Sequence, residues 1–206
     1  MRRALIVDWG GVLTAPITHA MQRWAAEEGL PYAETMAILD WYAPQPGEDH
    51  MMHALERGEV DAQGIANWLS DELHEHYGIA ISPDGLIQRM FDHFEPHDEI
   101  LNLCREARAA GWVTALLSNS WDNPYPRERW DNAFDAVLIS GEIGMRKPEE
   151  RIFLHALNVL CVEAAHTVFV DDEEPNIIAA RELGITAIFA QDQHAAAAEL
   201  RVILQA

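Results

Sequence analysis

Residues 3–14 read Arg-Ala-Leu-Ile-Val-Asp-Trp-Gly-Gly-Val-Leu-Thr. The run over 4–7 is short and continuously apolar, which is typical of a strand buried on both faces of a parallel sheet. It ends at Asp8, and Gly10 and Gly11 follow at once. Open α/β sheets bind ligands beyond the carboxyl ends of their strands, and glycines let the backbone approach a ligand closely. The stretch predicts a central strand with a functional carboxylate at its end, although an ordinary solvated aspartate would give the same local pattern.

Polar residues follow two later apolar runs, and between these runs a lysine precedes a proline. The residues are Ser118 and Asn119 after 112–117, Lys147 before Pro148, and Asp171 and Asp172 after 167–170. Because parallel strands end at a common edge of the sheet, we expect these side chains to gather near Asp8.

In this order the four motifs resemble those of the haloacid dehalogenase (HAD) superfamily of hydrolases and phosphatases. The resemblance covers residues 3–190. It implies an α/β fold with a Rossmann-like parallel sheet and a small helical cap that is inserted between the first and second motifs.

The hydrophobic pattern is consistent with that architecture. It predicts strands over 4–7, 112–117, 134–139, 167–170 and 185–189. It predicts helices over 18–28, 32–42, 49–56, 62–77, 82–94, 99–110, 148–160, 175–183 and 195–204, with Asp61 as an N-cap and Pro148 as the first residue of its helix. Since 16–96 shows only helical patterns, we expect a cap domain over 16–96 and a core domain over 1–15 and 97–206.

Size and charge restrict the possible partners. The 206 residues are enough for one core and a small inserted subdomain. A net charge of −20 without a basic stripe argues against nucleic acid and anionic membrane surfaces as partners. No apolar run approaches the ~20 residues that a membrane span requires. Cys104 and Cys161 lie in apolar helical patterns and are expected to be buried and inert, which fits a cytoplasmic protein. Oligomeric state is not visible in the sequence.

The resemblance implies a role for each motif residue. Asp8 is the nucleophile, which forms an aspartyl-phosphate in phosphatases or an aspartyl ester in dehalogenases. Asp8, the backbone carbonyl of Gly10 and Asp172 are ligands of Mg²⁺, and Asp171 is a direct or water-mediated ligand. The residues alone leave another interpretation open, in which Asp171 and Asp172 only cap the following helix.

The other motif residues are expected to hold the phosphate. The backbone at Gly10 and Gly11, the hydroxyl of Ser118 and the loop at Asn119 surround its oxygens, while the Lys147 ammonium neutralises the nucleophile and the transferring group.

Further expectations concern residues near these motifs. Trp121, in the loop after the second motif, is a candidate substrate contact, and Arg146 is expected to be solvated. The cap tryptophans are expected in the core of a helical bundle, although they could line a substrate pocket. They are Trp24, Trp41 and Trp68.

One departure from the family pattern leaves the function open. Most family phosphatases carry a second aspartate two residues after the nucleophile, which protonates the leaving group and then activates water. Here that position is Gly10. A histidine of the cap is the candidate replacement for this proton donor, and His19 is the first choice among these histidines.

Three functions compete. The first is a Mg²⁺-dependent phosphatase of a small phosphorylated metabolite. The second is a dehalogenase-like carbon–halogen hydrolase that needs no metal. The third is a phosphate-binding or regulatory protein with little or no turnover, because Gly10 replaces the acid.

Overall fold

A computed structural model describes residues 2–39 and 50–205 of the chain. The end of the helix expected over 32–42, the start of the one expected over 49–56, and Trp41 lie outside the described residues.

The centre of the molecule is an all-parallel sheet in the order β3-β2-β1-β4-β5. Its strands are β1 (Ala4–Val7), β2 (Val113–Ser118), β3 (Ala136–Ile139), β4 (Thr167–Asp171) and β5 (Thr186–Phe189). As predicted, β1 is central. Val7 pairs with Leu116 of β2 and with Val170 of β4. This register brings the residues that follow β1, β2 and β4 to one edge of the sheet.

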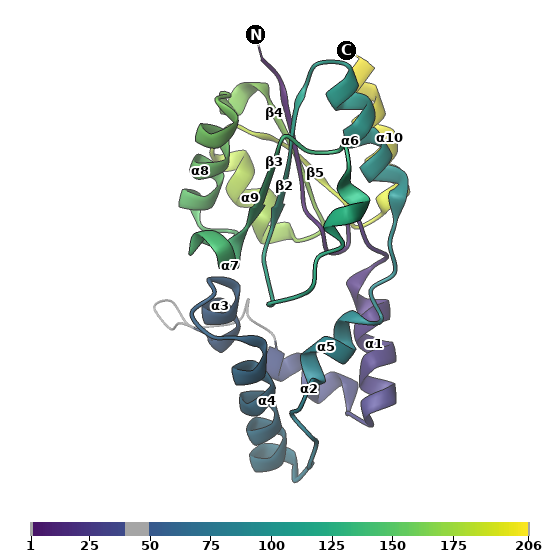
Figure 1. Ribbon diagram of the computed structural model, residues 1–206, viewed down its shortest axis with the longest axis vertical. Coiled ribbons are helices and arrows are strands. Elements are labelled where there is room, and N and C mark those ends of the chain that lie inside the picture. The colour runs from purple at the N-terminus through teal and green to yellow at the C-terminus, as the bar shows by residue number, and fades with distance from the viewer. Residues whose placement is uncertain (1, 40–49, 206) are drawn as a thin grey trace.

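Helices cover both faces of the sheet, as Figure 1 shows. On one face lie α6 (Asp98–Ala109) and α10 (Gln193–Gln205), and on the other lie α8 (Glu150–Leu160) and α9 (Glu174–Glu182). The protein therefore has the three-layer arrangement that the alternation of strands and helices predicts.

A separate group of helices lies beyond the carboxyl ends of the strands (Figure 1). It consists of α1 (Ile17–Glu28), α2 (Tyr32–Leu39), α3 (Met51–Glu56), α4 (Ala62–Tyr77) and α5 (Leu86–Phe91). The described part of 16–96 contains no strand, and an antiparallel bridge between Thr14 and Pro96 joins the two ends of this block. Asp61 caps α4, since its carboxylate accepts from the Gly64 N–H at 2.7 Å.

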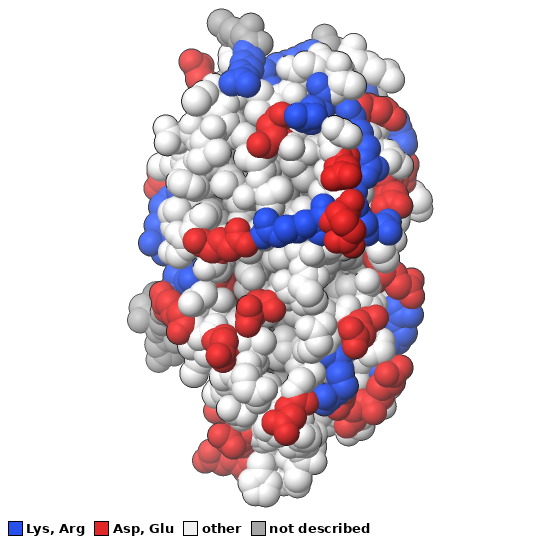
Figure 2. All heavy atoms as spheres, in the orientation of Figure 1, with Lys and Arg blue, Asp and Glu red and all other residues white. Residues whose placement is uncertain are grey.

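Basic and acidic side chains are interleaved on the face drawn in Figure 2, where no broad basic patch is seen. No helix among the described residues is both long and apolar enough to cross a membrane.

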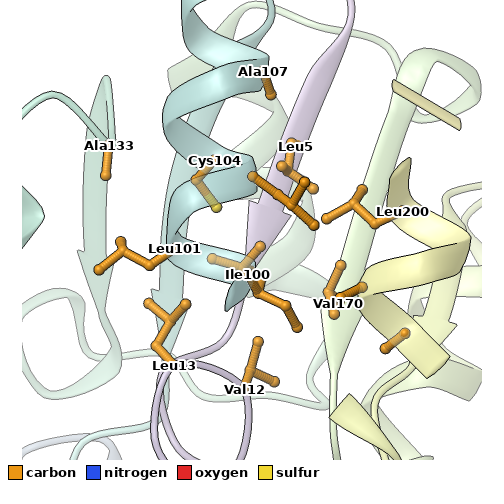
Figure 3. Close-up of a cluster of buried hydrophobic side chains, with 14 of the residues drawn as sticks. Leu5, Val12, Leu13, Ile100, Leu101, Cys104, Ala107, Ala133, Val170 and Leu200 are labelled. Carbon is orange, nitrogen blue, oxygen red and sulfur yellow. The ribbon is translucent and has the colours of Figure 1, made fainter. Parts of the chain in front are cut away.

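Alternation along β1 divides the core into two clusters. Leu5 and Val7 pack beneath α6 and α10, whereas Ala4 and Ile6 pack beneath α8 and α9. Figure 3 shows the first cluster, in which Cys104 of α6 is fully buried. The helical block has its own apolar cluster around Trp24, as predicted, and Trp68 packs against it.

Cys161 differs from the sequence prediction. It is exposed, because it follows the last turn of α8 with φ of 53°, where the backbone turns away from the apolar face of that helix.

Several element bounds also differ from the sequence prediction. The helix expected from Pro148 begins at Glu150, because residues 147–149 form the turn that leads into it. The helix expected over 82–94 is shorter. The short elements α7 (Ser140–Ile143), η1 (Arg127–Trp130) and η2 (Ala164–His166) gave no clear sequence signal.

Candidate active site

The motif residues meet at the carboxyl edge of the sheet. Asp8 follows β1, Ser118 ends β2, Asp171 ends β4, and Lys147 lies in the turn before α8. A cavity of about 100 Å³ has most of the predicted site residues in its wall. They are Asp8, Gly10, Ser118, Asn119, Trp121, Lys147 and Asp172. Asp172 also lines an adjoining, larger cavity, whose wall includes Gly11.

Lys147 lies between two carboxylates. Its Nζ is 2.9 Å from Asp8 Oδ1 and 2.6 Å from Asp171 Oδ2, and its side chain is 1% exposed. Burial raises the pKa of Asp8 to about 7, an effect that the Lys147 ammonium opposes and the Asp171 carboxylate increases. Burial alone would lower the pKa of Lys147, but Asp171 and Asp8 together raise it above its ordinary value. The lysine therefore stays charged beside Asp8.

Asp171 holds the loop before α9. Its Oδ2 faces Lys147, and its Oδ1 accepts from the Glu173 N–H at 2.8 Å and from Asn176 Nδ2 at 3.0 Å. Both of its oxygens therefore have protein partners. Asp171 thus binds the backbone just before α9, but the N-cap of that helix is Glu173, which makes no side-chain cap hydrogen bond.

Asp172 has an oxygen without such a partner. Its Oδ1 is buried and accepts no hydrogen bond from the residues that the structure describes. Asp8, Asp171 and Asp172 each offer an oxygen, and these atoms lie within 4.8 Å of one another. Burial raises the pKa of Asp172 well above its ordinary value, and the nearby charges of Asp171 and Asp8 raise it further. Three carboxylates beside one ammonium form an all-oxygen site that fits a divalent cation such as Mg²⁺.

Gly11 makes room for Asp172. A Cβ on Gly11 would stand 1.9 Å from Asp172 Oδ2, and the glycine has φ of +64°. Both the close approach and the left-handed backbone require glycine at this position.

Asn119 holds Lys147 by its backbone. The side-chain Nδ2 donates to the Lys147 carbonyl at 3.0 Å, and the Lys147 N–H donates to Asn119 Oδ1 at 2.8 Å. Ser118 Oγ accepts from the Tyr125 hydroxyl at 2.9 Å. Sequence reasoning missed Tyr125, since nothing in its local pattern distinguishes it from other loop tyrosines.

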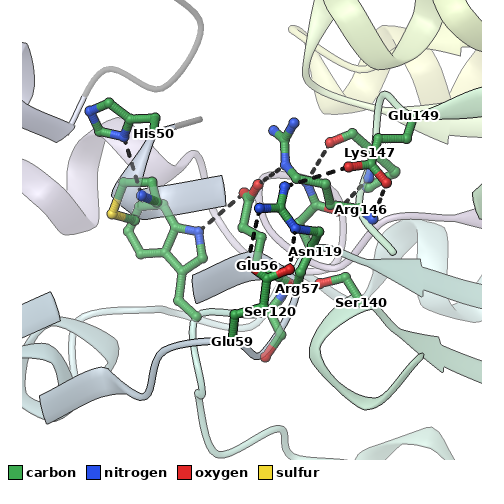
Figure 4. Close-up of polar contacts among 12 residues, drawn as sticks. His50, Glu56, Arg57, Glu59, Asn119, Ser120, Ser140, Arg146, Lys147 and Glu149 are labelled. Carbon is green, nitrogen blue, oxygen red and sulfur yellow. Dashed lines mark hydrogen bonds and ion pairs between the residues drawn. The ribbon is translucent and has the colours of Figure 1, made fainter. Parts of the chain in front are cut away.

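Arg146 is not solvated, contrary to the sequence prediction. It is 5% exposed, and its Nε forms a buried ion pair with Glu56 of α3, as Figure 4 shows. The Trp121 indole N–H donates to Glu56 at 3.4 Å, and the Ser140 hydroxyl donates to the Glu56 carbonyl. Burial raises the pKa of Glu56, and the Arg146 charge opposes that effect. The pair joins the helical block to the sheet, and its members lie 90 residues apart in sequence, which is why local patterns did not reveal it.

The space that an aspartate side chain at residue 10 would need is partly occupied. A Cβ on Gly10 would stand 3.0 Å from Ile17 Cδ1, at the start of α1. His19, the candidate replacement, is exposed and lines neither of the two cavities at this edge. Trp9 is mainly a packing residue, stacked on Phe94 with ring centroids 5.5 Å apart.

The larger cavity, of about 600 Å³, extends from Asp172 under the helical block. Away from Asp172, the wall of this cavity is mainly apolar and is formed by α1, α2 and the loop after β2. The apolar lining residues include Ile17, Met21, Tyr32, Met36, Leu39 and Trp121.

The model of the haloacid dehalogenase-like hydrolase family matches residues 2–184. The chain belongs to this family of hydrolases. The HAD-like assignment agrees with the order of the four motifs and with the central position of β1.

Two curated relatives illustrate the range of the family. The chain is 32% identical to a sesquiterpene phosphatase, astK, of Aspergillus oryzae over 53% of the chain and 58% of that protein. It is 26% identical to bifunctional epoxide hydrolase 2 of Sus scrofa over 98% of the chain and 38% of that protein. The chain thus spans about half the length of these relatives or less.

Solved structures share the fold. A HAD family enzyme of Bacteroides thetaiotaomicron, in complex with magnesium and inorganic phosphate, superposes with a TM-score of 0.63 at 20% identity, covering 92% of this chain and 94% of that one. A dehalogenase superposes with a TM-score of 0.65 at 19% identity, covering 93% and 86%.

Proposed function

We propose that this HAD-like hydrolase is a Mg²⁺-dependent phosphatase that acts through an aspartyl-phosphate on Asp8. The observation that carries the proposal is the pairing of Asp8 with the buried Lys147 beside the unpartnered carboxylate oxygen of Asp172. A metal-free dehalogenase has no use for that acidic residue, so the acidic site favours phosphate over halide chemistry.

We infer that Asp8, the Gly10 carbonyl and Asp172 would hold the ion, while Asp171 positions Lys147. Both oxygens of Asp171 already have protein partners, which supports this division of roles. When bound, Mg²⁺ offsets the repulsion between an anionic nucleophile and an anionic substrate.

In the proposed reaction, an Asp8 oxygen attacks phosphorus, and the bond from phosphorus to the leaving oxygen breaks. Lys147 and Ser118 stabilise the charge of the transferring group. Water then attacks the phosphorus of the aspartyl-phosphate, releasing phosphate and the free carboxylate. Because Gly10 supplies no proton, the leaving group departs as an anion or takes a proton from water. Acidic leaving groups are therefore favoured, and the hydrolytic step is slow.

The larger cavity points to the substrate class. Its aliphatic and aromatic lining, next to Asp172, suits a phosphate monoester with a sizeable apolar group. The relative in Aspergillus oryzae is named a sesquiterpene phosphatase, which agrees with such a substrate. In this proposal the helices of 16–96 act as a cap domain that provides most of the apolar wall, and 1–15 with 97–206 act as the catalytic core.

A binding role without turnover is the second candidate, and the Ile17 side chain beside Gly10 favours it. Phosphate release from p-nitrophenyl phosphate, which has a good leaving group, separates the two functions. We expect release that requires Mg²⁺, is abolished in Asp8→Asn and Asp172→Asn, and is unchanged in Asp71→Asn, an exposed control on α4. Phosphate binding without release would support the second candidate. Release that persists in Asp8→Asn would contradict the assigned nucleophile.

A further inference from the structure

A second cluster of metal-ligating side chains lies outside the active site, at the starts of two helices. It consists of His97, Glu99 and His194, which we call the histidine cluster. His97 is the N-cap residue of α6, Glu99 lies in the first turn of α6, and His194 lies in the first turn of α10. Each offers one ligand atom, and the three atoms lie within 4.8 Å of one another.

Helix packing and backbone hydrogen bonds position the three residues. Helices α6 and α10 pack side by side on one face of the sheet (Figure 1). The His97 N–H donates to the Leu13 carbonyl at 2.9 Å, and the His194 N–H donates to Asp192 Oδ1 at 3.0 Å. The backbone at both ends of the cluster is therefore held by hydrogen bonds.

Glu99 and His194 are joined by a direct hydrogen bond, which a bound ion would replace. Glu99 Oε2 lies 2.7 Å from His194 Nδ1, and its other oxygen accepts from Arg201 at 2.9 Å. Carboxylates that bind metals are commonly oriented by such an outer hydrogen bond. The rings of His97 and His194 lie edge to face with centroids 5.7 Å apart. His97 Nδ1 is buried and has no hydrogen-bond partner within the described ranges 2–39 and 50–205.

We propose that the histidine cluster is a second metal site, which binds a borderline transition-metal ion of the Zn²⁺ class. Two imidazoles and one carboxylate form a ligand set that Zn²⁺ accepts, whereas Mg²⁺ prefers oxygen ligands. The two sites thus differ in chemistry as well as in place. The His194 side chain is 81% exposed, so an ion reaches the cluster from solvent and water completes its coordination.

The location gives the ion a structural role. His97 directly follows Pro96, which pairs with Thr14 where the chain enters and leaves the helical block. The preceding residue of α10, Gln193, donates to the carbonyls of Gly11 and Thr14. An ion in the histidine cluster therefore links the start of α10 to the start of α6, where the chain returns from the helical block to the sheet. The ion stabilises this junction.

Calorimetric titration of the full chain with Zn²⁺, in the presence of saturating Mg²⁺, tests the proposal. We expect one equivalent to bind and to raise the melting temperature by roughly 5 to 10 °C when free Zn²⁺ is about 100 times Kd. His194→Gln removes an exposed ligand with little risk to folding and raises Kd by more than about tenfold, as does His97→Gln. His74→Gln, an exposed control on α4, leaves binding unchanged.

Asp172→Asn separates this site from the active site. We expect Zn²⁺ binding at the histidine cluster to survive that substitution, whether or not the phosphatase proposal is correct. Three results would overturn the proposal: no Zn²⁺ binding by the wild type, binding that both histidine variants retain in full, or binding that is lost in Asp172→Asn.

Discussion

The terminal methyl carbon of Ile17 lies 3.0 Å from the point where a Cβ would stand on Gly10. Residue 10 is the position at which most phosphatases of this family carry the second aspartate, which acts as the general acid. The backbone of Gly10 is not in the left-handed region, and the obstructing atom is the end of a flexible side chain. A side chain at residue 10 therefore requires only that Ile17 move.

Restoring the acid is the first prediction. Gly10→Asp combined with Ile17→Ala should raise kcat/KM for an alkyl phosphate by roughly 100- to 10,000-fold, the usual contribution of general acid–base catalysis. p-Nitrophenyl phosphate should gain much less, because its leaving group needs no proton. Gly10→Asp alone should gain less than the double variant, and Ile17→Ala alone should gain nothing. A double variant with unchanged activity toward the alkyl phosphate would show that the scaffold lacks more than the acid.

The buried pair between Glu56 and Arg146 should stabilise the contact between the helical block and the core. Arg146→Met leaves the Glu56 carboxylate buried without its charged partner, which should lower the free energy of unfolding by about 3–5 kcal/mol. The double variant Glu56→Met/Arg146→Met should lose less than the sum of the two single losses. Urea unfolding of the four proteins measures this coupling. A loss below about 1 kcal/mol in Arg146→Met would indicate a pair no stronger than a surface pair.

The apolar cavity should select for the organic part of the substrate. Ala37 lines this cavity on α2, so Ala37→Trp should lower kcat/KM for a long-chain alkyl phosphate while leaving p-nitrophenyl phosphate nearly unaffected. Gln22→Trp, at an exposed position of α1 outside the cavity wall, is the matched control. Equal effects of Ala37→Trp on both substrates would argue that the cavity does not hold the apolar group.

Asp135 should make stability depend on pH. Burial opposes ionisation, but the Thr114 N–H and Arg108 hold the pKa of Asp135 below its ordinary value of 3.8. The unfolded chain therefore binds the proton first as the pH falls. The stabilisation is complete above about pH 5 and is lost as the pH falls through the folded pKa.

Asp135→Asn should accordingly be less stable than the wild type at pH 7. The difference should be under about 1 kcal/mol, because this half-exposed pair is screened by solvent. Urea unfolding at a series of pH values should show the difference shrinking below about pH 5. A difference that grows as the pH falls would contradict the assigned direction of the pKa.

Much of the fold was predictable because its signals are local. The apolar run before Asp8 identified the central strand, and Asp61 marked the start of α4. The meeting of Asp8, Ser118 and Asp171 at one edge followed from the common direction of parallel strands. Their catalytic and metal-binding roles stay predictions.

The remaining features depend on long-range contacts or on backbone angles that the hydrophobic pattern does not show. The local sequence predicts Arg146 at the surface, but α3 places Glu56 against it. The Asn119 amide holds the Lys147 backbone, a contact between distant residues that no local pattern reveals, while the expected phosphate contact at this loop stays a prediction. Cys161 continues the apolar pattern of α8, yet the left-handed end of that helix exposes it. In each case the deciding partner or backbone angle lies outside the local pattern.

The central claim, that Asp8 carries a phosphoryl group, is tested most directly by rapid-quench kinetics with p-nitrophenyl phosphate and Mg²⁺. The first step needs no acid with this leaving group, whereas the second step lacks the base that activates water. We therefore predict a burst of about one p-nitrophenolate per chain before a slower steady state. After acid quenching, mass spectrometry should find the phosphoryl group on the peptide that contains Asp8. Turnover without a burst and without such an adduct, or an adduct that persists in Asp8→Asn, would contradict the account.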